Sequence, residues 1–310
     1  MPVIALTGAT GFIGRATLAR LLASSTTPRL RVLVRDPRRL PIDDPRIETV
    51  KGDLTDPDAL DALVTDSDAI VHLAGAIAGS RQRDFDRVNI EGTALLAEAV
   101  LRRAPQAHAL LVSSLAATRP ALSWYAASKA GAERAWRDRL AATSTVLRPP
   151  AVYGPDDPAL ADFWRMLARG WLIRLGPAEA RFSLVHVDDV AEAIERLLLR
   201  GPSPTPFPLA GPQPEGGWRW PDVAALAASI RGKHIRTVAV PGIALRTAGA
   251  LALAGRRLTG GHALLSPGKV RELRHVDWVC DNLALTAHLD WQPDRRLDSA
   301  LDSLPGWARA

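Results

Sequence analysis

The chain has 310 residues, of which 47% are hydrophobic and 23% are charged, and its formal net charge is +6. This length and composition fit one large globular domain, or one domain with a smaller lobe, and exclude an intrinsically disordered chain. Cys280 is the only cysteine, which excludes disulfide cross-links and cysteine-cluster metal sites and makes the reducing cytoplasm the expected compartment.

The positive charge raises the question of nucleic-acid or membrane partners. The 39 basic residues include only four lysines, are scattered along the sequence and form no run interleaved with aromatic residues, so we expect no nucleic-acid partner. The apolar stretch 238–255 is broken by Pro241 and Arg246, so no integral membrane segment is expected. The basic residues around it, Arg246, Arg256 and Arg257, leave contact with a membrane surface open. Because a strand pattern begins at Val3, we expect no signal peptide.

Short apolar runs alternate with amphipathic segments through the first half of the sequence. Strands are predicted at 3–6, 30–34, 47–50, 69–73, 109–113 and 145–147, and helices near 13–24, 56–64, 84–103 and 123–142. Strict alternation predicts an α/β fold in which a doubly wound parallel sheet is covered by helices on both faces.

The pattern changes after Pro149. Proline and glycine become frequent, and six prolines fall between residues 201 and 214. A strand-like run at 182–187 and a helical segment at 188–200 indicate a return to the first domain. We therefore predict a dinucleotide-binding domain over 1–155, to which 181–200 returns. A smaller, discontinuous C-terminal lobe over 156–180 and 201–310 would bind the substrate.

The first predicted strand runs directly into a glycine-rich turn, Thr7 to Gly14, which is followed by a helix. Glycines let the backbone approach a pyrophosphate, and a helix N-terminus offers oriented N–H groups and partial positive charge. We therefore expect Gly8, Gly11 and Gly14, with Thr10 in the same turn, to bind a dinucleotide. A tight turn that binds no ligand is the alternative.

The residues after the second predicted strand bear on the choice of cofactor. About 20 residues beyond the last glycine, dinucleotide folds place the group that reads the adenosine ribose. Arg35 leaves the strand first and suits a 2′-phosphate, so NADP(H) is favoured, with Arg38 or Arg39 as further cations. NAD(H) is the alternative if Asp36 reads the ribose hydroxyls. Asp53, after the third predicted strand, is expected near the adenine, unless it only begins a helix.

Three residues form a candidate catalytic group. Tyr125 and Lys129 are four residues apart in a predicted helix, so both side chains lie on one face. An ammonium at about 4 Å contributes roughly 4 kcal/mol at an effective dielectric near 20, which would bring a phenol pKa of about 10 toward neutrality. Ser114 ends the fifth predicted strand and can polarise a carbonyl. An exposed helix face and a capping serine are the alternatives.

Two further sets of residues carry less specific signals. His72 closes a predicted strand, whereas Asp188 and Asp189 follow His186 and open a predicted helix, where carboxylates stabilise the helix dipole. We therefore predict no metal site. The nine tryptophans favour apolar packing and suggest an apolar substrate pocket.

Taken together, the motifs resemble the extended short-chain dehydrogenase/reductases, the group described broadly as NAD-dependent epimerase/dehydratase. The residues that carry the resemblance are 7–14, Gly52-Asp53-Leu54, His72-Leu73-Ala74-Gly75, Val88-Asn89 with Gly92-Thr93, Ser113-Ser114, Tyr125 with Lys129, 148–155 and 186–191. They occur in the family's order between about residues 2 and 200, and beyond that only 278–293 is similar. The resemblance implies a Rossmann-type sheet with a small substrate lobe.

The resemblance also implies roles for individual residues. It assigns catalysis to Ser114, Tyr125 and Lys129, with Lys129 also holding the cofactor's ribose. It places Gly8, Gly11, Phe12, Ile13, Gly14, Asp53, Leu54, Leu73, Ala74, Gly75 and Asn89 along the cofactor, and Pro149, Pro150 and Val152 near the nicotinamide. It allows a homodimer formed by the helices near 84–103 and 123–142.

Two departures from the family pattern weaken a sugar-nucleotide substrate. Members that act on sugar nucleotides commonly have Arg-Tyr-Phe-Asn where this chain has residues 148–151, Arg-Pro-Pro-Ala, and dehydratases have two acids where Leu115 and Ala116 stand. We therefore expect an oxidoreductase that moves a hydride between nicotinamide and a carbonyl or secondary alcohol of a small, apolar substrate. The alternatives are a nucleotide-sugar epimerase that retains NAD and a non-catalytic dinucleotide-binding sensor or assembly subunit.

Overall fold

Strands and helices alternate through the first 148 residues of the computed structural model, which describes residues 1–26, 28–40, 42–259, 263 and 265–307. The strands are β1 (Val3–Thr7), β2 (Arg29–Val34), β3 (Ile47–Lys51), β4 (Ala69–His72), β5 (His108–Val112) and β6 (Ser144–Arg148). The helices are α1 (Phe12–Leu22), α2 (Pro57–Val64), α3 (Gln82–Asp86), α4 (Gly92–Arg103) and α5 (Trp124–Leu140). Short 3₁₀ turns are η1 (Pro37–Arg39), η3 (Leu115–Thr118) and η4 (Pro120–Leu122).

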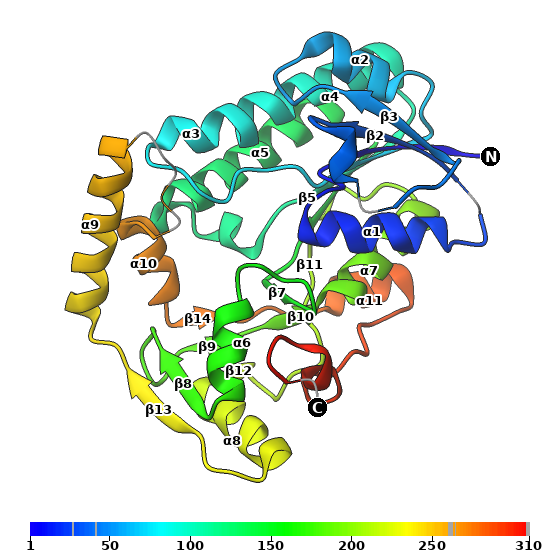
Figure 1. Ribbon diagram of the computed structural model, residues 1–310. Coiled ribbons are helices and arrows are strands. Elements are labelled where there is room, and N and C mark those ends of the chain that lie inside the picture. The colour runs from blue at the N-terminus through cyan, green and yellow to red at the C-terminus, as the bar shows by residue number, and fades with distance from the viewer. Residues whose placement is uncertain (27, 41, 260–262, 264, 308–310) are drawn as a thin grey trace.

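These strands and β11 (Phe207–Pro208) form a parallel sheet of seven strands in the order β11-β6-β5-β4-β1-β2-β3. Helix α1 and helix α7 (Val187–Arg200) cover one face, and α2, α4 and α5 cover the other (Figure 1). The predicted doubly wound α/β fold is therefore confirmed. The strand order reverses between β1 and β4, and ligands of such sheets bind where the carboxyl ends of these two strands part.

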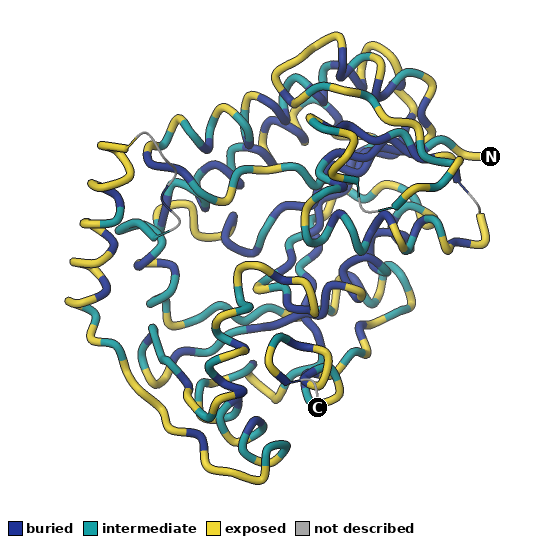
Figure 2. The backbone as a smooth tube through the Cα atoms, viewed as in Figure 1, coloured by how far each residue is buried: buried dark blue, intermediate teal, exposed yellow. Residues whose placement is uncertain are grey.

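Burial follows from the two layers of helices. Strands β4 and β5 are buried along their whole length, because helices cover the sheet on both sides. Figure 2 shows the same contrast, with the central strands of the sheet dark blue and the outer turns of the helices yellow. Among the described residues, no helix is long and apolar enough to cross a membrane.

Two predicted elements differ in the structure. The helix expected at 84–103 is divided by a π-helical turn at Arg87–Glu91, which separates α3 from α4. The buried Asn89 lies in this turn and hydrogen-bonds to two other segments, as described below. The single strand expected at 182–187 is two strands, β9 (Arg181–Phe182) and β10 (Leu184–His186), which belong to different sheets.

The rest of the chain forms small sheets and a second group of helices. Strand β7 (Ala151–Tyr153) pairs with β10, β8 (Trp171–Arg174) pairs with β13 (Arg236–Ala239), and β9 lies between β12 (Trp218–Arg219) and β14 (Asp277–Trp278). The helices are α6 (Ala161–Ala168), α8 (Trp220–Arg231), α9 (Gly242–Thr259), α10 (Pro267–Leu273), α11 (Leu283–Leu289) and α12 (Leu297–Ala300), with a 3₁₀ turn η5 (Leu301–Ser303). Helices α9 and α10 stand at one edge of the molecule (Figure 1).

The division into 1–155 with 181–200, and 156–180 with 201–310, stays a prediction, and the structure adds two details to it. Strand β11 lies within the large sheet, and Leu285 of α11 is fully buried in the same core as α1 and α7. Both come from the part of the sequence that we assigned to the lobe. The chain therefore returns to the large sheet after α7 as well.

Candidate active site

Two glycines pack the turn after β1 against its neighbours. Gly8 has a φ of +78°, and a Cβ on it would lie 2.6 Å from the backbone nitrogen of Ala74. A Cβ on Gly14 would overlap the carbonyl oxygen of Gly8. Only glycine fits at these positions, so α1, the turn and the segment after β4 approach one another backbone to backbone.

The N-terminus of α1 suits an anionic ligand. Gly11 caps the helix without a side-chain hydrogen bond, and the first turn holds no acidic residue. The N–H groups of this turn therefore lack side-chain partners, which is the arrangement that binds a pyrophosphate. Ile13 packs against the core of the sheet, and Phe12 lies beside Gly154 at the end of β7. These residues fit a dinucleotide, and Thr10 is half-buried in the same turn.

The segment after β4 is held by a buried polar chain. Thr7 Oγ1 and His72 Nδ1 share a hydrogen bond of 2.7 Å, and His72 Nε2 and Thr93 Oγ1 share one of 2.9 Å. Ala74 N–H also donates to Thr7 Oγ1 at 3.2 Å. Burial lowers the pKa of His72 to about 3, so the ring is neutral. His72 thus links β1, β4 and α4 and positions Leu73 to Gly75.

Asn89 connects that segment to α5. Its Oδ1 accepts a hydrogen bond from Ala76 N–H at 2.7 Å, and its Nδ2 donates to Ala76 O at 3.0 Å and to Ser128 Oγ at 2.8 Å. Ser128 Oγ in turn donates to Tyr125 O at 2.8 Å. Both amide hydrogens of Asn89 are used, so the structure gives it a positioning role, and its contact with a cofactor stays a prediction.

The side chains at the ribose end are engaged unequally. Asp36 Oδ1 accepts from Arg38 N–H at 3.1 Å, and the Arg38 guanidinium pairs with both carboxylate oxygens at 3.0 Å. These hydrogen bonds hold the pKa of Asp36 below its usual value. Arg35 is exposed and makes no hydrogen bond or ion pair within the described part of the chain. Of the two competing residues, Arg35 is the one whose side chain is not already engaged.

Asp53 and Leu54 follow β3 as expected. Asp53 Oδ1 accepts from both the N–H and the hydroxyl of Thr55 at 2.7 Å. These bonds lower the pKa of Asp53, and the charges of Arg87 and Arg35 lower it further, so Arg35 lies within electrostatic reach. The side chain of Leu54 is buried against Gly92, which places it in the core below α4.

The backbone fixes Ser114 at the carboxyl end of β5. Ser114 Oγ accepts a hydrogen bond from Ala116 N–H at 3.2 Å and caps the turn η3. Leu115 N–H donates to Pro149 O at 2.8 Å, which holds the segment of Pro149 and Pro150 beside this turn. Val152 pairs with Val185 of β10 and packs against the sheet core. The structure thus brings these residues together at one edge of the sheet.

Tyr125 lies in the first turn of α5, which Ser123 caps by accepting from Ala126 N–H at 3.0 Å. The Ser114 side chain lies close enough to the Tyr125 phenol to lower its pKa. Lys129 lies one turn further on, is buried and donates from Nζ to Val112 O at 3.0 Å. The three predicted catalytic residues are therefore close together.

The pKa values differ from the simplest expectation. Burial raises the pKa of Tyr125 to about 12, while the hydrogen bond with Ser114 lowers it and the charge of Glu272 raises it. Burial outweighs the other influences, so the phenol pKa lies above its ordinary value of 10 and not near neutrality, contrary to the expectation from the Tyr125–Lys129 spacing. Burial lowers the pKa of Lys129 itself to about 8, and Glu133 opposes that shift.

Helix α10 contributes two residues that sequence reasoning missed. Lys269 Nζ lies 5.8 Å from the centre of the Tyr125 ring and donates to Glu272 Oε2 at 2.8 Å. Glu272 is buried and also accepts a hydrogen bond from Ser123 Oγ, at the cap of α5. The scarcity of lysine was the signal in the sequence that could have pointed to Lys269. The chain has only four lysines, and in the structure two of them, Lys129 and Lys269, lie beside Tyr125.

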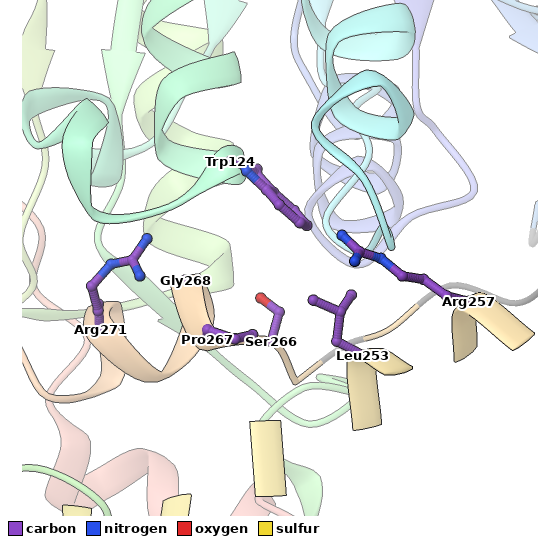
Figure 3. Close-up of a pocket in the computed structure, with 7 residues that line it drawn as sticks. All are labelled: Trp124, Leu253, Arg257, Ser266, Pro267, Gly268 and Arg271. Atoms are coloured by element: carbon purple, nitrogen blue, oxygen red, sulfur yellow. The ribbon is translucent and has the colours of Figure 1, made fainter. Parts of the chain in front are cut away.

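A pocket of about 160 Å³ lies next to this group, between α5, α9 and α10 (Figure 3). Its lining consists of Trp124, Leu253, Arg257, Ser266, Pro267, Gly268 and Arg271. The Arg257 guanidinium lies 5.9 Å from the centre of the Trp124 ring, and Figure 3 shows Arg271 on the opposite side of the pocket. The pocket combines apolar side chains with two cations.

The residues considered for a metal have other partners. His186 Nδ1 accepts from Asp188 N–H at 3.2 Å, so His186 caps α7 and the two aspartates lie in its first turn. Asp189 is fully buried and pairs with Arg295 at 2.6 Å. Within the described ranges, no group of three or more histidine, cysteine, aspartate or glutamate residues could hold a metal ion.

Comparisons with known proteins agree with this geometry. Residues 4–210 match the model of the NAD dependent epimerase/dehydratase family. The chain is 37% identical over 277 residues to a ceramide reductase of Caulobacter vibrioides, covering 89% of this chain and 86% of that protein. Its fold is similar to that of a Bacillus anthracis dTDP-glucose 4,6-dehydratase solved with NAD, with a TM-score of 0.73 and 18% identity over 99% and 96% of the two chains.

A human epimerase family protein solved with NADPH has the same fold, with a TM-score of 0.73 and 19% identity over 98% of this chain and 99% of that one. Both nicotinamide cofactors therefore occur on this fold. The family match, the similarity to a reductase and the grouping of Ser114, Tyr125 and Lys129 lead to one conclusion. The chain is an NAD(P)-dependent enzyme that belongs to the NAD-dependent epimerase/dehydratase family, the extended short-chain dehydrogenase/reductases.

Proposed function

We propose that this chain is an NADP(H)-preferring reductase that acts on the carbonyl, or the corresponding secondary alcohol, of an apolar, ceramide-like lipid. The observation that carries the proposal is the grouping of Ser114, Tyr125 and Lys129 at the carboxyl edge of β5. Ser114 acts on the Tyr125 phenol, and Lys129 is buried one turn further along α5 and donates to Val112 O at 3.0 Å. A bound nicotinamide supplies or accepts the hydride. The remaining steps belong to the side chains of this site.

Tyr125 acts as the general acid in reduction. Its pKa of about 12 keeps the phenol protonated at neutral pH, so it has a proton to donate to the carbonyl oxygen. Ser114 donates a hydrogen bond to the same oxygen as negative charge develops there. Lys129, with a pKa of about 8, is protonated at neutral pH and stabilises the phenolate that remains.

Three observations support an apolar substrate. The relative from Caulobacter is a ceramide reductase. The pocket beside Tyr125 has the apolar side chains of Trp124, Leu253 and Pro267 among its lining, together with two arginines and a serine. Ala151 stands where members that act on sugar nucleotides commonly carry the asparagine that helps hold the sugar phosphate. A ceramide analogue with a ketone in place of a secondary hydroxyl is therefore the first substrate to test.

The test follows nicotinamide absorbance with NADPH and a panel of that ketone, short-chain ketones and nucleotide sugars. We expect turnover of the lipid ketone and a loss of about 10²- to 10⁴-fold in Tyr125→Phe, with NADPH binding retained. Tyr153→Phe, which changes the chain's only other tyrosine, is the matched control and keeps its turnover. Unchanged turnover in Tyr125→Phe refutes the mechanism. Tightly held NAD in the purified protein, with turnover of nucleotide sugars alone, identifies an epimerase instead.

Arg35 carries the proposed preference for NADP(H). A charge-assisted hydrogen bond to the 2′-phosphate is worth about 1.5 to 3 kcal/mol, or roughly a 10- to 150-fold preference. We expect calorimetric titration to give NADPH at least a tenfold advantage over NADH, and Arg35→Ala to close most of the gap. Arg29→Ala, at the opposite end of β2, is the control. Equal or tighter NADH binding by the unaltered protein would assign ribose reading to Asp36.

A further inference from the structure

Helix α9 has two apolar faces. Its buried residues are Leu245, Gly249 and Leu253. Gly249 packs against α10, and Leu253 lines the pocket beside Trp124. The opposite side of an α-helix is reached by steps of three or four from Ile243. Those positions are Ile243, Thr247, Leu251, Ala254 and Leu258, and all of them are exposed.

The outward face is unusual for a surface helix. Ile243, Leu251 and Leu258 are 70%, 68% and 88% exposed, and Thr247 is the only polar residue among the five positions. A surface helix of a globular protein normally presents charged or polar side chains to water, and contiguous exposed apolar groups mark an interaction site. Figures 1 and 2 show α9 at the edge of the molecule, with most of its backbone coloured as exposed.

The stretch of sequence that contains α9 is rich in basic residues. From Val223 to Arg271 the sequence holds eight lysine and arginine residues and no aspartate or glutamate. The whole chain has a net charge of +6, so all of the positive excess lies in this segment and the remainder is net negative. Basic residues occur all along the sequence. The segment 223–271 has a high net charge because it contains no acidic residues. Arg246, Arg256 and Arg257 belong to α9 itself.

We propose that α9 lies on an anionic lipid bilayer, with an apolar ridge of Ile243, Leu251 and Leu258 inserted at the level of the headgroups and the exposed Arg246 against lipid phosphates. Arg257 hydrogen-bonds to Ser80 O and stays with the protein. An apolar ridge on a helix in a net basic segment is the composition of interfacial helices that lie in the membrane plane. A nucleic acid would match the arginines but leave the ridge unpaired. A second copy of this chain would bring like charges together.

The placement of α9 gives this contact a consequence. Its inward residue Leu253 and its Arg257 line the pocket beside Trp124, while the outward ridge faces away from the protein. A membrane-bound α9 therefore brings the pocket next to the bilayer. The proposal concerns binding to lipid only and holds whether or not the chain is a reductase.

Vesicle cosedimentation of the full chain tests the proposal. We expect binding to vesicles of phosphatidylcholine with phosphatidylglycerol, weaker binding to phosphatidylcholine alone, and weakening by salt. The variant Ile243→Ser/Leu251→Ser/Leu258→Ser should lose at least tenfold in partitioning. Leu101→Ser/Leu199→Ser changes exposed leucines of α4 and α7 and is the matched control that keeps binding. Thermal unfolding verifies that both variants fold.

Two results overturn the proposal. The first is equal partitioning of the ridge variant, the control variant and the unaltered protein, which shows that the ridge does not touch lipid. The second comes from light scattering after size exclusion without lipid. If the ridge variant has a smaller particle mass than the other two proteins, the ridge joins copies of this chain instead.

Discussion

The proposed catalytic residues show opposite effects of the same burial. Burial favours the neutral form of each group, so it raises the pKa of the Tyr125 phenol and lowers that of the Lys129 ammonium. At neutral pH both still carry their protons. Lys129 is therefore the group whose titration lies nearest physiological pH, and the pH dependence of the enzyme should report on it.

We expect kcat/KM for reduction to fall above a pH of about 8, as Lys129 loses its proton and no longer stabilises the developing phenolate. In Lys129→Met the remaining activity should be low and should lack this decline. Lys233→Met changes an exposed lysine and should keep the profile of the unaltered protein. A decline near pH 8 that persists in Lys129→Met would assign it to another group.

Lys129 should also lower the stability of the fold. Its pKa is about 8 in the folded protein against an ordinary value of 10.5, so between these pH values the unfolded chain binds more protons and stability rises with pH. Below pH 8 the buried ammonium costs a few kcal/mol, at about 1.4 kcal/mol per pKa unit. Denaturant unfolding at pH 7 should therefore show Lys129→Met to be the more stable protein. A less stable variant would mean that the bond to Val112 O outweighs this cost.

The secondary elements that could be predicted from sequence are those with a local pattern. Six of the seven strands of the large sheet were expected from their apolar runs, and the glycine turn from its spacing. The two-residue strands β9, β12 and β14 are too short to show a periodicity. The π-helical turn depends on the buried amide of Asn89, and the position of α10 depends on Glu272 meeting the cap of α5. Such contacts join distant parts of the chain.

The position of α1 against the turn can be tested by adding one methyl group. Gly14→Ala would place a Cβ against the carbonyl oxygen of Gly8, which is backbone and cannot rotate away. We expect overpacking to cost about 1–3 kcal/mol in unfolding free energy and to weaken NADPH binding as α1 shifts. Gly255→Ala in α9 meets nothing within 4 Å and should be neutral or slightly stabilising. Denaturant unfolding and NADPH titration of both variants test this expectation. Normal NADPH binding by Gly14→Ala would contradict the role of this turn in binding the cofactor.

For the molecule as a whole, Arg295 ties the C-terminal segment to the large sheet. It pairs with the fully buried Asp189 at 2.6 Å, and its carbonyl accepts a hydrogen bond from the Tyr153 hydroxyl at 3.4 Å. Burial raises the pKa of Asp189, and Arg295 lowers it. Loss of Arg295 would leave an unpaired buried carboxylate.

Arg295→Met should therefore cost about 3–5 kcal/mol in unfolding free energy at pH 7. Because a raised carboxyl pKa means that the folded state binds more protons, the variant should regain part of this loss as the pH falls toward the pKa of Asp189. The neighbouring Arg296→Met breaks only an exposed pair with Asp298 and should cost no more than about 1 kcal/mol. Equal unfolding free energies of the two variants would show that the buried pair contributes nothing.

The pairing of β11 with β6 affects how long one edge of the large sheet stays exposed during translation. Strand β6 ends at Arg148, yet the two residues that cover its open edge are Phe207 and Pro208. Until they leave the ribosome, roughly 3 to 12 s later at 5–20 residues per second, the edge of β6 presents free backbone groups to other nascent chains. Once in place, Pro208 has no N–H to offer a further strand, and the sheet can grow no wider on that side.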